Sequence, residues 1–393
     1  MFQLPEISEN QDIYIYGFGL AGKWLSANLA GNIKAFIDTD FKKVGREFQG
    51  HKVISIPDAQ KICDEDSVIV VTVIDIQDVL SIVKRIPHKK WIALGSHLND
   101  TKATNNPVEE SVSFVEYSLK AVEDCHKGYF SKDRIFLRSV DVVITEKCSL
   151  KCKDCSNLMQ YYEAPVNISF EEIVRDFEEL TSTVDQIYEV RLIGGEPFMN
   201  KDIYKIIQHL IASPKITKLV VYSNAMIPIK EDQAEILKNP KVVFSLTDYG
   251  ALSKNTTKIT QSLDAMGVAY RLHPPENWTD SGTIFDFKRS LEDQKHLFSE
   301  CCGKNLLTVT DGKLYRCPFA ANADRLRGIP QDALNSVSVK ASPQEIRHYI
   351  SEIEYLPACN YCKGRSFGAP EIVPAVQALK PISYVKFPMD KAK

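Results

Sequence analysis

Short apolar runs typical of β-strands alternate with helical patterns along this chain of 393 residues, and the alternation stops and restarts once. Strand-like runs occur at 13–17, 34–38, 67–73 and 91–95, and residues 75–86 have apolar positions at helical spacing. Strands that are apolar on both faces and separated by helices are typical of a parallel sheet covered by helices. The first hundred residues are therefore predicted to form a parallel α/β domain.

The second series begins at Val140. Its strand-like runs occur at 140–144, 189–195, 218–224, 241–248 and 268–273. Repeated β/α units of this size predict a partial (β/α)6 barrel. In such a barrel the functional residues gather at the carboxyl ends of the strands.

The loop after the first strand-like run has the spacing GxGxxG, formed by Gly17, Gly19 and Gly22, and Asp38 ends the next run. Such glycines let a pyrophosphate approach a helix N-terminus, and the acid can accept a ribose hydroxyl. Three interpretations of this Rossmann-like domain stay open. It binds NAD, or it is a docking domain in which the glycines serve only the turn. The third is a nucleotide-sugar-type module, because residues 35–58 resemble the N-terminal domain of sugar acyltransferases and of some carbohydrate-cluster methyltransferases.

Three cysteines in the spacing CxxxCxxC, Cys148, Cys152 and Cys155, follow the strand-like run 140–144. Clustered thiolates select zinc, copper(I) or iron–sulfur clusters over hard cations. A closed zinc site needs four ligands, and no further cysteine or histidine follows this loop until far along the chain. An iron–sulfur cubane held by three cysteines leaves one iron open for another molecule, which predicts a catalytic centre.

This triplet resembles that of the radical S-adenosylmethionine (radical SAM) superfamily. The resemblance implies a [4Fe–4S] cluster on the three cysteines, with SAM bound to the fourth iron. It also implies that an external one-electron reductant, such as flavodoxin or ferredoxin, drives formation of a 5′-deoxyadenosyl radical. The sequence departs from the family at Asp154, where an aromatic residue usually helps to pack the adenosyl group.

The motif GGEP, formed by Gly194, Gly195, Glu196 and Pro197, follows the next strand-like run. Its glycines allow close backbone approach by a ligand, and its glutamate can accept a hydrogen bond from an ammonium group. The radical SAM family carries this motif for the amino group of SAM. The resemblance also implies SAM contacts at the ends of the next two strands, from Ser223, Asn224, Ser245 and Asp248.

A second group of cysteines surrounds a predicted hairpin beyond residue 300, whose turn is Asp311-Gly312, a type I′ signal. The group consists of Cys302, Cys317, Cys359 and Cys362. One interpretation is a structural zinc ribbon. The order of these residues also resembles the twitch domain, the shortened form of the SPASM extension of radical SAM enzymes. That resemblance implies an auxiliary [4Fe–4S] cluster on the four cysteines.

Cys301 has three candidate roles: a ligand in place of Cys302, a buried apolar side chain, or a thiol that gives a hydrogen atom to a substrate radical. Adjacent residues in an extended chain point to opposite faces, so we expect only one of the two at the cluster. Cys63 and Cys125 are predicted to be core residues.

The leading functional hypothesis is hydrogen abstraction from a carbon of a sugar or cyclitol derivative, free or nucleotide-linked. An auxiliary cluster that accepts the remaining electron favours dehydrogenation, similar to the twitch-type dehydrogenase of aminoglycoside biosynthesis. A thiol hydrogen donor instead gives epimerisation, as in the neomycin-type epimerase. Arg271 and Trp278 are candidates for contacting an anionic group and a ring face. The alternatives are a peptide-modifying radical SAM enzyme (a RiPP maturase) and a non-catalytic iron–sulfur or zinc redox protein, against which Glu196 argues.

Composition is that of a folded enzyme, with 44% hydrophobic and 25% charged residues and a net charge of −3. The charge pattern favours neither a nucleic-acid nor a membrane partner, and the N-terminus does not resemble a signal peptide, so a cytoplasmic protein with reduced thiols is predicted. The predicted domains are a Rossmann-like domain (1–105), a linker (106–137), a radical SAM partial barrel (138–298), a twitch domain (299–370) and a C-terminal tail (371–393).

Overall fold

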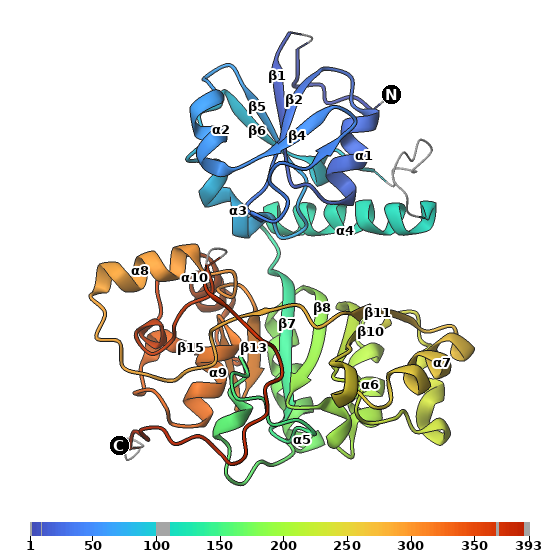
Figure 1. Cartoon of the computed structure of the whole chain (residues 1–393), viewed down its shortest axis with the longest axis vertical. Helices are drawn as coiled ribbons and strands as arrows, with labels where there is room; N and C mark the ends of the chain where they lie inside the picture. Colours follow the sequence, from blue (N-terminus) through green and yellow to red (C-terminus); the bar gives the residue numbers. More distant parts are fainter. Residues whose placement is uncertain (1, 9, 100–110, 367–368, 389–393) are drawn as a thin grey trace. The chain divides into compact units, whose positions relative to one another are not determined.

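The computed structural model describes residues 2–8, 10–99, 111–366 and 369–388. The chain divides into two compact units, Met1–Asp133 and Arg134–Lys393 (Figure 1). Both units are mixed α/β structures built on largely parallel sheets, as the alternation in the sequence predicts. Among the helices of the described residues, not one combines the length and the apolar character needed to cross a membrane.

The first unit contains a six-stranded sheet in the order β3-β4-β2-β1-β5-β6. All neighbouring strands pair in parallel except β3 with β4. The strands are β1 (Asp12–Tyr16), β2 (Asn32–Ile37), β3 (Glu47–Phe48), β4 (His51–Ile54), β5 (Val68–Val71) and β6 (Lys90–Ala93). The helices are α1 (Leu20–Asn28), α2 (Ile56–Ile62), α3 (Ile76–Val83) and α4 (Val112–Phe130).

Helix α4 occupies much of the segment that the sequence suggested as a linker. Val115, Leu119 and Val122 on this helix are buried in the same core cluster as the residues of β1 and β5. The buried His126 fixes α4 further, because its Nε2 donates to the Val73 carbonyl at 2.7 Å and its Nδ1 accepts from the Gly95 amide at 3.0 Å. Helix α4 therefore packs as part of the first unit.

The second unit contains an eight-stranded sheet in the order β11-β10-β9-β8-β7-β13-β14-β15, and a two-stranded ribbon of β12 and β16. Its strands are β7 (Phe136–Thr145), β8 (Gln186–Gly194), β9 (Ile216–Ser223), β10 (Val242–Thr247), β11 (Ala269–His273), β12 (Trp278–Thr279), β13 (Leu307–Thr310), β14 (Lys313–Tyr315), β15 (Ser336–Ser338) and β16 (Glu371–Ile372). Its helices are α5 (Phe170–Thr183), α6 (Ile203–Ala212), α7 (Thr256–Met266), α8 (Leu291–Glu300), α9 (Pro318–Arg325) and α10 (Pro343–Ser351).

The parallel part of this sheet differs from the expected series of six β/α units. Strands β7 to β11 pair in parallel and follow one another as β/α units. The sixth parallel strand is β13, which pairs with the other edge of β7 and belongs to the cysteine-flanked hairpin. β13 takes this sixth position because it pairs with the backbone N–H and C=O groups along the edge of β7 that β8 leaves open.

The hairpin of β13 and β14 has the predicted turn. Asp311 and Gly312 have φ values of 54° and 70°, as a type I′ turn requires. The register pairs Thr310 with Lys313 and Thr308 with Tyr315. Because β13 also pairs with β7, the region with the second cysteine group is joined to the sheet that positions the first.

One face of the large sheet packs against helices through an apolar core, and the other face carries charged residues. Val140, Val142, Leu192 and Val221 belong to that core. Since side chains alternate along a strand, the residues between them point to the opposite face. These include two sets in register, Asp141 with Arg191, and Tyr222 with Ser245 and Arg271.

Candidate active site

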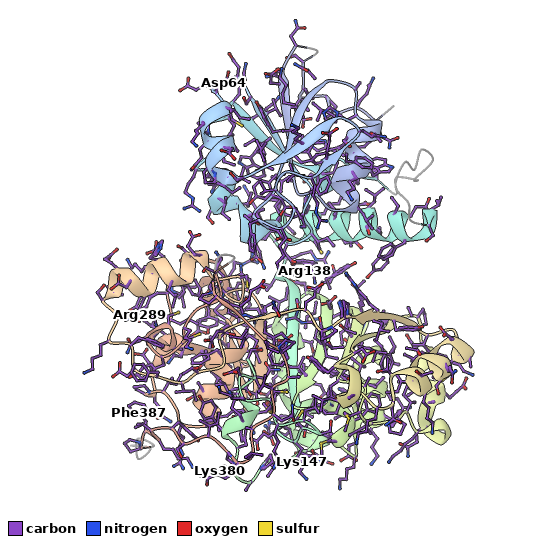
Figure 2. All side chains as sticks on the ribbon, viewed as in Figure 1. Asp64, Arg138, Lys147, Arg289, Lys380 and Phe387 are labelled. Atoms are coloured by element: carbon purple, nitrogen blue, oxygen red, sulfur yellow. The ribbon has the colours of Figure 1, made fainter. Side chains whose placement is uncertain are left out.

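The loop after β7 carries the first cysteine triplet. Cys152 is buried, Cys148 and Cys155 are half-buried, and the three thiols lie close enough to interact electrostatically. Figure 2 places Lys147, which directly precedes this loop, at the lower edge of the second unit, and Arg138 at the opposite end of β7. The loop packs into a small apolar cluster with Leu150, Met226, Tyr249, Leu252, Trp278 and Ala375.

The chemistry of these thiols fits an iron–sulfur cluster. Burial raises the pKa of all three, to about 11 for Cys152, so that each holds its proton until a soft metal replaces it. The backbone amides of Asn157, Leu158 and Met159 lie near the sulfur of Cys155 and partly offset the effect of burial on its pKa, an arrangement that suits a cluster thiolate. Within the described ranges, no three His, Cys, Asp or Glu side chains converge on one point as ligands of a single ion would. The ligands of a cubane bind separate irons and stand farther apart.

Glu196 lies at the carboxyl end of β8 and is fully buried. Its Oε2 accepts from the Asn224 amide at 2.8 Å and its Oε1 accepts from the Phe198 amide at 3.3 Å. Burial raises its pKa to about 7 despite these hydrogen bonds. Each carboxylate oxygen keeps a second lone pair, so the group can still accept from a ligand ammonium.

The glycines of GGEP permit a close approach by the chain's own backbone. A Cβ on Gly194 would lie 2.0 Å from the Thr145 carbonyl oxygen, and one on Gly195 would lie 2.0 Å from that of Lys147. Gly194 also has φ +132°, which side chains rarely allow. The Gly195 and Glu196 amides donate to the same two carbonyls at 2.9 and 2.8 Å. The motif therefore holds the cysteine loop beside Glu196, and Pro197 begins the short 3-10 turn that follows.

Asn224, at the end of β9, connects the cysteine loop with GGEP. Its Nδ2 donates to Cys148 Sγ at 3.6 Å and to Ser149 Oγ at 3.1 Å, while its amide donates to Glu196. Ser253 Oγ donates to the Asn224 carbonyl at 2.7 Å. One amide residue thus fixes the relative positions of the triplet and the buried carboxylate.

The other predicted SAM contacts lie at the same end of the sheet. Ser223 is buried beside the Glu196 side chain and accepts from the Ala225 amide at 3.1 Å. Ser245 is buried near the end of β10, on the charged face. Asp248 follows β10, where its Oδ1 accepts from the Gly250 amide at 2.8 Å and shapes the next turn.

The second cysteine group is assembled from three segments of the chain. The thiols that interact with one another are those of Cys301, Cys317, Cys359 and Cys362. The sequence assigned this place to Cys302, whose amide donates to the Arg365 carbonyl at 2.9 Å. Cys301 ends α8, and its Sγ accepts from the Gly303 amide at 3.4 Å, so the turn that leaves the helix directs Cys301 to the group.

Arg289 holds the CxxC loop of this second group and was not anticipated from the sequence. Its Nη1 donates to the carbonyls of Cys359 and Cys362, each at 2.7 Å. Its amide donates to Asn360 Oδ1 at 2.7 Å. Figure 2 shows Arg289 beside the start of α8. An arginine on an extended segment carries no spacing signal, and only the tertiary structure shows its partners.

The charged face of the sheet carries a buried ion pair between Asp141 and Arg191, with Oδ1 and Nε 2.5 Å apart. The Arg191 guanidinium lies 5.9 Å from the centre of the Tyr222 ring. Arg365, three residues after Cys362, contributes its positive charge to Asp141 and to Cys317. The sequence signal for this pair was the presence of two charged residues, Asp141 and Arg191, inside strands that were predicted to be buried.

The two candidate substrate contacts lie in different surroundings. Arg271 is exposed on β11, in register with Ser245 on the charged face. Trp278 packs against the first cysteine triplet, with its ring 5.9 Å from that of Tyr249 in an edge arrangement. The tryptophan is therefore placed beside the cluster loop.

The glycine loop of the first unit, predicted as a nucleotide site, makes several contacts within the chain itself. Both Asp38 carboxylate oxygens accept from the chain itself: Oδ2 from the Phe18 amide at 2.9 Å and from Lys43 Nζ at 3.2 Å, and Oδ1 from the Asp40 amide at 2.9 Å. Gly17 has φ +111°, and a Cβ on Gly22 would lie 2.1 Å from the Gly17 carbonyl oxygen, whereas one on Gly19 would meet nothing within 4 Å. Gly17 and Gly22 thus serve the turn and its packing on α1. Cys63 and Cys125 are buried, as predicted.

Residues 142–249, which contain the triplet, GGEP and the strand ends described above, match the model of the radical SAM superfamily. The chain contains a radical SAM domain. Its cofactors are a [4Fe–4S] cluster and SAM, for which the buried thiols and Glu196 provide suitable groups.

Curated relatives of the radical SAM domain are named GTP 3′,8-cyclase. That of Lactiplantibacillus plantarum is 27% identical over 155 residues, which cover 37% of this chain and 46% of the relative. That of Listeria monocytogenes is 33% identical over 115 residues, which cover 29% and 32%. The chain thus spans less than half the length of these curated relatives.

Two solved structures are similar in part. BtrN in complex with AdoMet and 2-DOIA is 14% identical with a TM-score of 0.40, over 58% of this chain and 93% of BtrN. Streptococcus suis SuiB bound to S-adenosylmethionine is 19% identical with a TM-score of 0.30, over 43% and 41% of the two chains.

Proposed function

We propose that this protein is a radical SAM enzyme that holds a second [4Fe–4S] cluster. The enzyme would oxidise an alcohol carbon of a small, oxygen-rich substrate. When bound, the first cluster and SAM supply a hydrogen-abstracting radical, and the second cluster supplies an electron acceptor. The observation that carries this proposal is the meeting of Cys301, Cys317, Cys359 and Cys362 in the unit that also holds the triplet. An external one-electron reductant, such as flavodoxin or ferredoxin, would be the protein partner.

The auxiliary ligands in this proposal are Cys301, Cys317, Cys359 and Cys362, with Cys301 in the place first given to Cys302. The region from α8 to the CxxC loop would then be a twitch domain. Burial raises the pKa of Cys317 to about 11 and that of Cys359 to about 12, which suits thiolates that are stabilised by a metal centre. Since Cys301 would be a ligand, it is not available as a hydrogen donor. Dehydrogenation is therefore favoured over epimerisation.

The chain's own contribution at the first centre is to bind and orient SAM. The Glu196 carboxylate would accept hydrogen bonds from the SAM ammonium, while the Asn224 and Phe198 amides hold it in place. Ser223 and Ser245 would contribute hydroxyls beside it. The apolar cluster around the triplet, with Tyr249 and Trp278, keeps water from the cysteine loop.

The substrate class is supported by the charged face of the sheet. Asp141 and Arg191 form a buried pair that can bind hydroxyl groups, and Arg365 adds positive charge near them. Arg271 lies farther along the same face, in register with Ser245. Such a face suits a sugar that carries a phosphate, as in a nucleotide or a nucleotide-linked sugar. In the oxidation, the groups held by the two sets of cysteines would take a hydrogen atom and an electron from the substrate carbon, and Asp141 or water would accept the hydroxyl proton.

Cyclisation of a nucleotide is the second candidate function, because curated relatives of the radical SAM domain are named GTP 3′,8-cyclase. Both candidates begin with hydrogen abstraction, and they differ in the fate of the substrate radical. A dehydrogenase forms a carbonyl two mass units below the substrate, whereas cyclisation forms a new bond within the nucleotide.

The test is substrate-dependent release of 5′-deoxyadenosine. Anaerobically reconstituted protein is mixed with SAM, reductant and one compound at a time: GTP, a nucleotide-linked sugar, the free sugar or a peptide. Stimulation by the nucleotide-linked sugar, with a product two mass units lighter, is the expected result. Stimulation by GTP with a cyclic product supports the second function, and stimulation by peptides alone contradicts both. A protein that binds clusters but releases no 5′-deoxyadenosine under strong reduction would be a redox protein.

For the first unit, we propose a Rossmann-like domain that serves docking rather than NAD binding. The Asp38 oxygens already accept from Phe18, Asp40 and Lys43, so less of this carboxylate is left for a ribose hydroxyl than in an NAD site. Titration with NAD and with a nucleotide-linked sugar, followed by the fluorescence of Trp24 and Trp91, tests this. A saturable change with NAD would contradict the docking role. We also propose that the protein works in the reducing cytoplasm, which suits its ten cysteines without disulfides.

A further inference from the structure

The segment after residue 370 turns at Pro374 and Ala375 and then lies along the first cysteine loop. The Lys153 amide donates to the Val376 carbonyl at 2.7 Å, and the Ala378 amide donates to the Lys151 carbonyl at 2.6 Å. These bonds make an antiparallel bridge between Cys152 and Gln377. Figure 2 shows Lys380, on this segment, at the same lower edge of the unit as Lys147. We call residues 371–388 the C-terminal strap.

The C-terminal strap is fixed on both sides of this bridge. Before it, Ile372 of β16 pairs with Trp278 of β12. After it, the Ile382 amide donates to the Gln160 carbonyl at 2.9 Å, and the Phe387 amide donates to the Arg327 carbonyl at 2.8 Å. The strap is therefore held over the cysteine loop by pairings at several points along its length.

The Gln377 side chain reaches the sulfur of Cys152. Its Nε2 lies 3.5 Å from Cys152 Sγ and 2.7 Å from the Ala375 carbonyl oxygen, and its Oε1 accepts from the Lys151 amide at 2.8 Å. The orientation of the amide follows from its partners. A backbone N–H can only donate and a carbonyl can only accept, so the NH2 group must face Ala375 and Cys152. One of its hydrogens is then directed at the sulfur.

The three cysteines of the triplet differ in the source of their donors. Cys155 has backbone amides of the turn that follows it nearby, and Cys148 has the Leu150 amide nearby and receives a hydrogen bond from the Asn224 side chain. Cys152 receives its side-chain donor from Gln377, 225 residues farther along the chain. The cysteine loop alone cannot supply this hydrogen bond.

We infer that Gln377 is a positioning residue that raises the reduction potential of the SAM-binding cluster through its hydrogen bond to Cys152. Reduction adds a negative charge to the cluster, and an N–H donor to a ligand sulfur stabilises that charge. The strap also shields one side of the loop, because Ala375 is buried against Leu150 and Cys152. Gln377 acts on the cofactor site alone, and its role requires nothing of the substrate proposed above.

Two substitutions separate the donor from the rest of the side chain. Gln377→Glu keeps an oxygen for the Lys151 amide but replaces the donor to Cys152 with a negative charge. Gln377→Met keeps the length and has neither group. The matched control is Leu379→Met, because Leu379 is fully exposed on the same strap.

The measurement is a potentiometric titration of the reconstituted full-length protein, followed by electron paramagnetic resonance, in which the signal that changes on adding SAM identifies the first cluster. We expect Gln377→Met to lower the ratio of reduced to oxidised cluster about tenfold at fixed potential, a shift of about 59 mV to more negative values for one electron. Gln377→Glu should shift the reduction potential further in the same direction, and Leu379→Met should leave the potential unchanged. An unchanged potential in both Gln377 variants at full iron content would overturn the assignment.

If both variants lose the first cluster, a second measurement on the unmodified protein decides. Pulsed electron paramagnetic resonance of protein labelled with 15N in its glutamine side-chain amides should show a weak coupling between one nitrogen and the SAM-responsive cluster. The label in the Leu379→Met protein should give the same coupling. Absence of the coupling contradicts the hydrogen bond, whereas a wild-type cluster that still responds to SAM leaves the proposed function intact.

Discussion

The two cysteine groups of the second unit are built in different ways. Cys148, Cys152 and Cys155 lie in one loop, whose spacing alone brings three thiols together. The second group takes Cys301 from the end of α8, Cys317 from the start of α9 and the CxxC pair from a later loop. Its convergence depends on the hairpin that joins β13 to β7 and on the extended segment that carries Arg289. A local site can be predicted from spacing, and a site assembled from distant segments requires the tertiary structure.

The largest effect is expected at the local group. Cys148→Ala removes one of three ligands from a buried loop, so we expect loss of the SAM-binding cluster, which is about four of the eight irons expected per chain, and no detectable 5′-deoxyadenosine. Iron analysis and product chromatography measure both. Cys63→Ala is the control, because Cys63 is buried in the first unit. Full iron content in Cys148→Ala would show that the triplet is not the ligand set.

A pair of neighbouring substitutions tests the assembled group. Cys301→Ala should lose about four irons while Cys302→Ala keeps them, because the Cys301 thiol interacts with those of Cys317, Cys359 and Cys362. Cys301→Ala should still release 5′-deoxyadenosine but form no oxidised product. Loss of iron in Cys302→Ala but not in Cys301→Ala would show that Cys302 is the ligand. Zinc in place of the iron would make the second group a structural site.

The sequence predicted features that depend on local spacing, and it did not predict those that depend on contacts between distant segments. The parallel sheets follow from apolar runs at fixed spacing, and the matched radical SAM segment contains the triplet and GGEP. The sequence placed α4 within a linker because the stretch before it is polar, whereas its apolar stripe packs on the first sheet. Cys301 and Cys302 could not be distinguished, because the turn after α8 decides which thiol points inward. The contact of Gln377 with Cys152 could not be predicted from the sequence, because the two residues lie 225 positions apart.

The third prediction concerns the affinity for SAM at the site beside the cysteine triplet, where Glu196 would bind the SAM ammonium group. Glu196→Gln removes the charge that faces the SAM ammonium, and hydrogen bonds to charged groups are worth roughly 1.5–3 kcal/mol, so affinity for SAM should fall about 10- to 100-fold. Equilibrium dialysis with labelled SAM measures the change. Glu171→Gln, on the exposed start of α5, is the control and should bind as the unmodified protein does.

The same carboxyl gives a pH dependence. Burial raises the pKa of Glu196 to about 7, so the group becomes neutral as pH falls through that value and the attraction for the SAM ammonium is lost. Affinity for SAM should therefore weaken by up to about tenfold per pH unit below pH 7. In Glu196→Gln this dependence should disappear. An equally steep profile in the variant would assign the titration to another group.

The smallest effect is expected from Arg289, which holds the assembled group without providing a ligand. Arg289→Gln removes a guanidinium that donates to the carbonyls of Cys359 and Cys362. Because this side chain is partly exposed, we expect a loss of about 1 kcal/mol, equivalent to roughly a fivefold faster release of the auxiliary irons to a chelator. The iron content before the challenge should stay complete, in contrast to Cys301→Ala. Lys288→Gln is the matched control, since Lys288 is exposed at the neighbouring position. Equal release rates in the two variants would mean that the CxxC loop keeps its shape without Arg289, and that the hairpin alone is enough to bring the second group together.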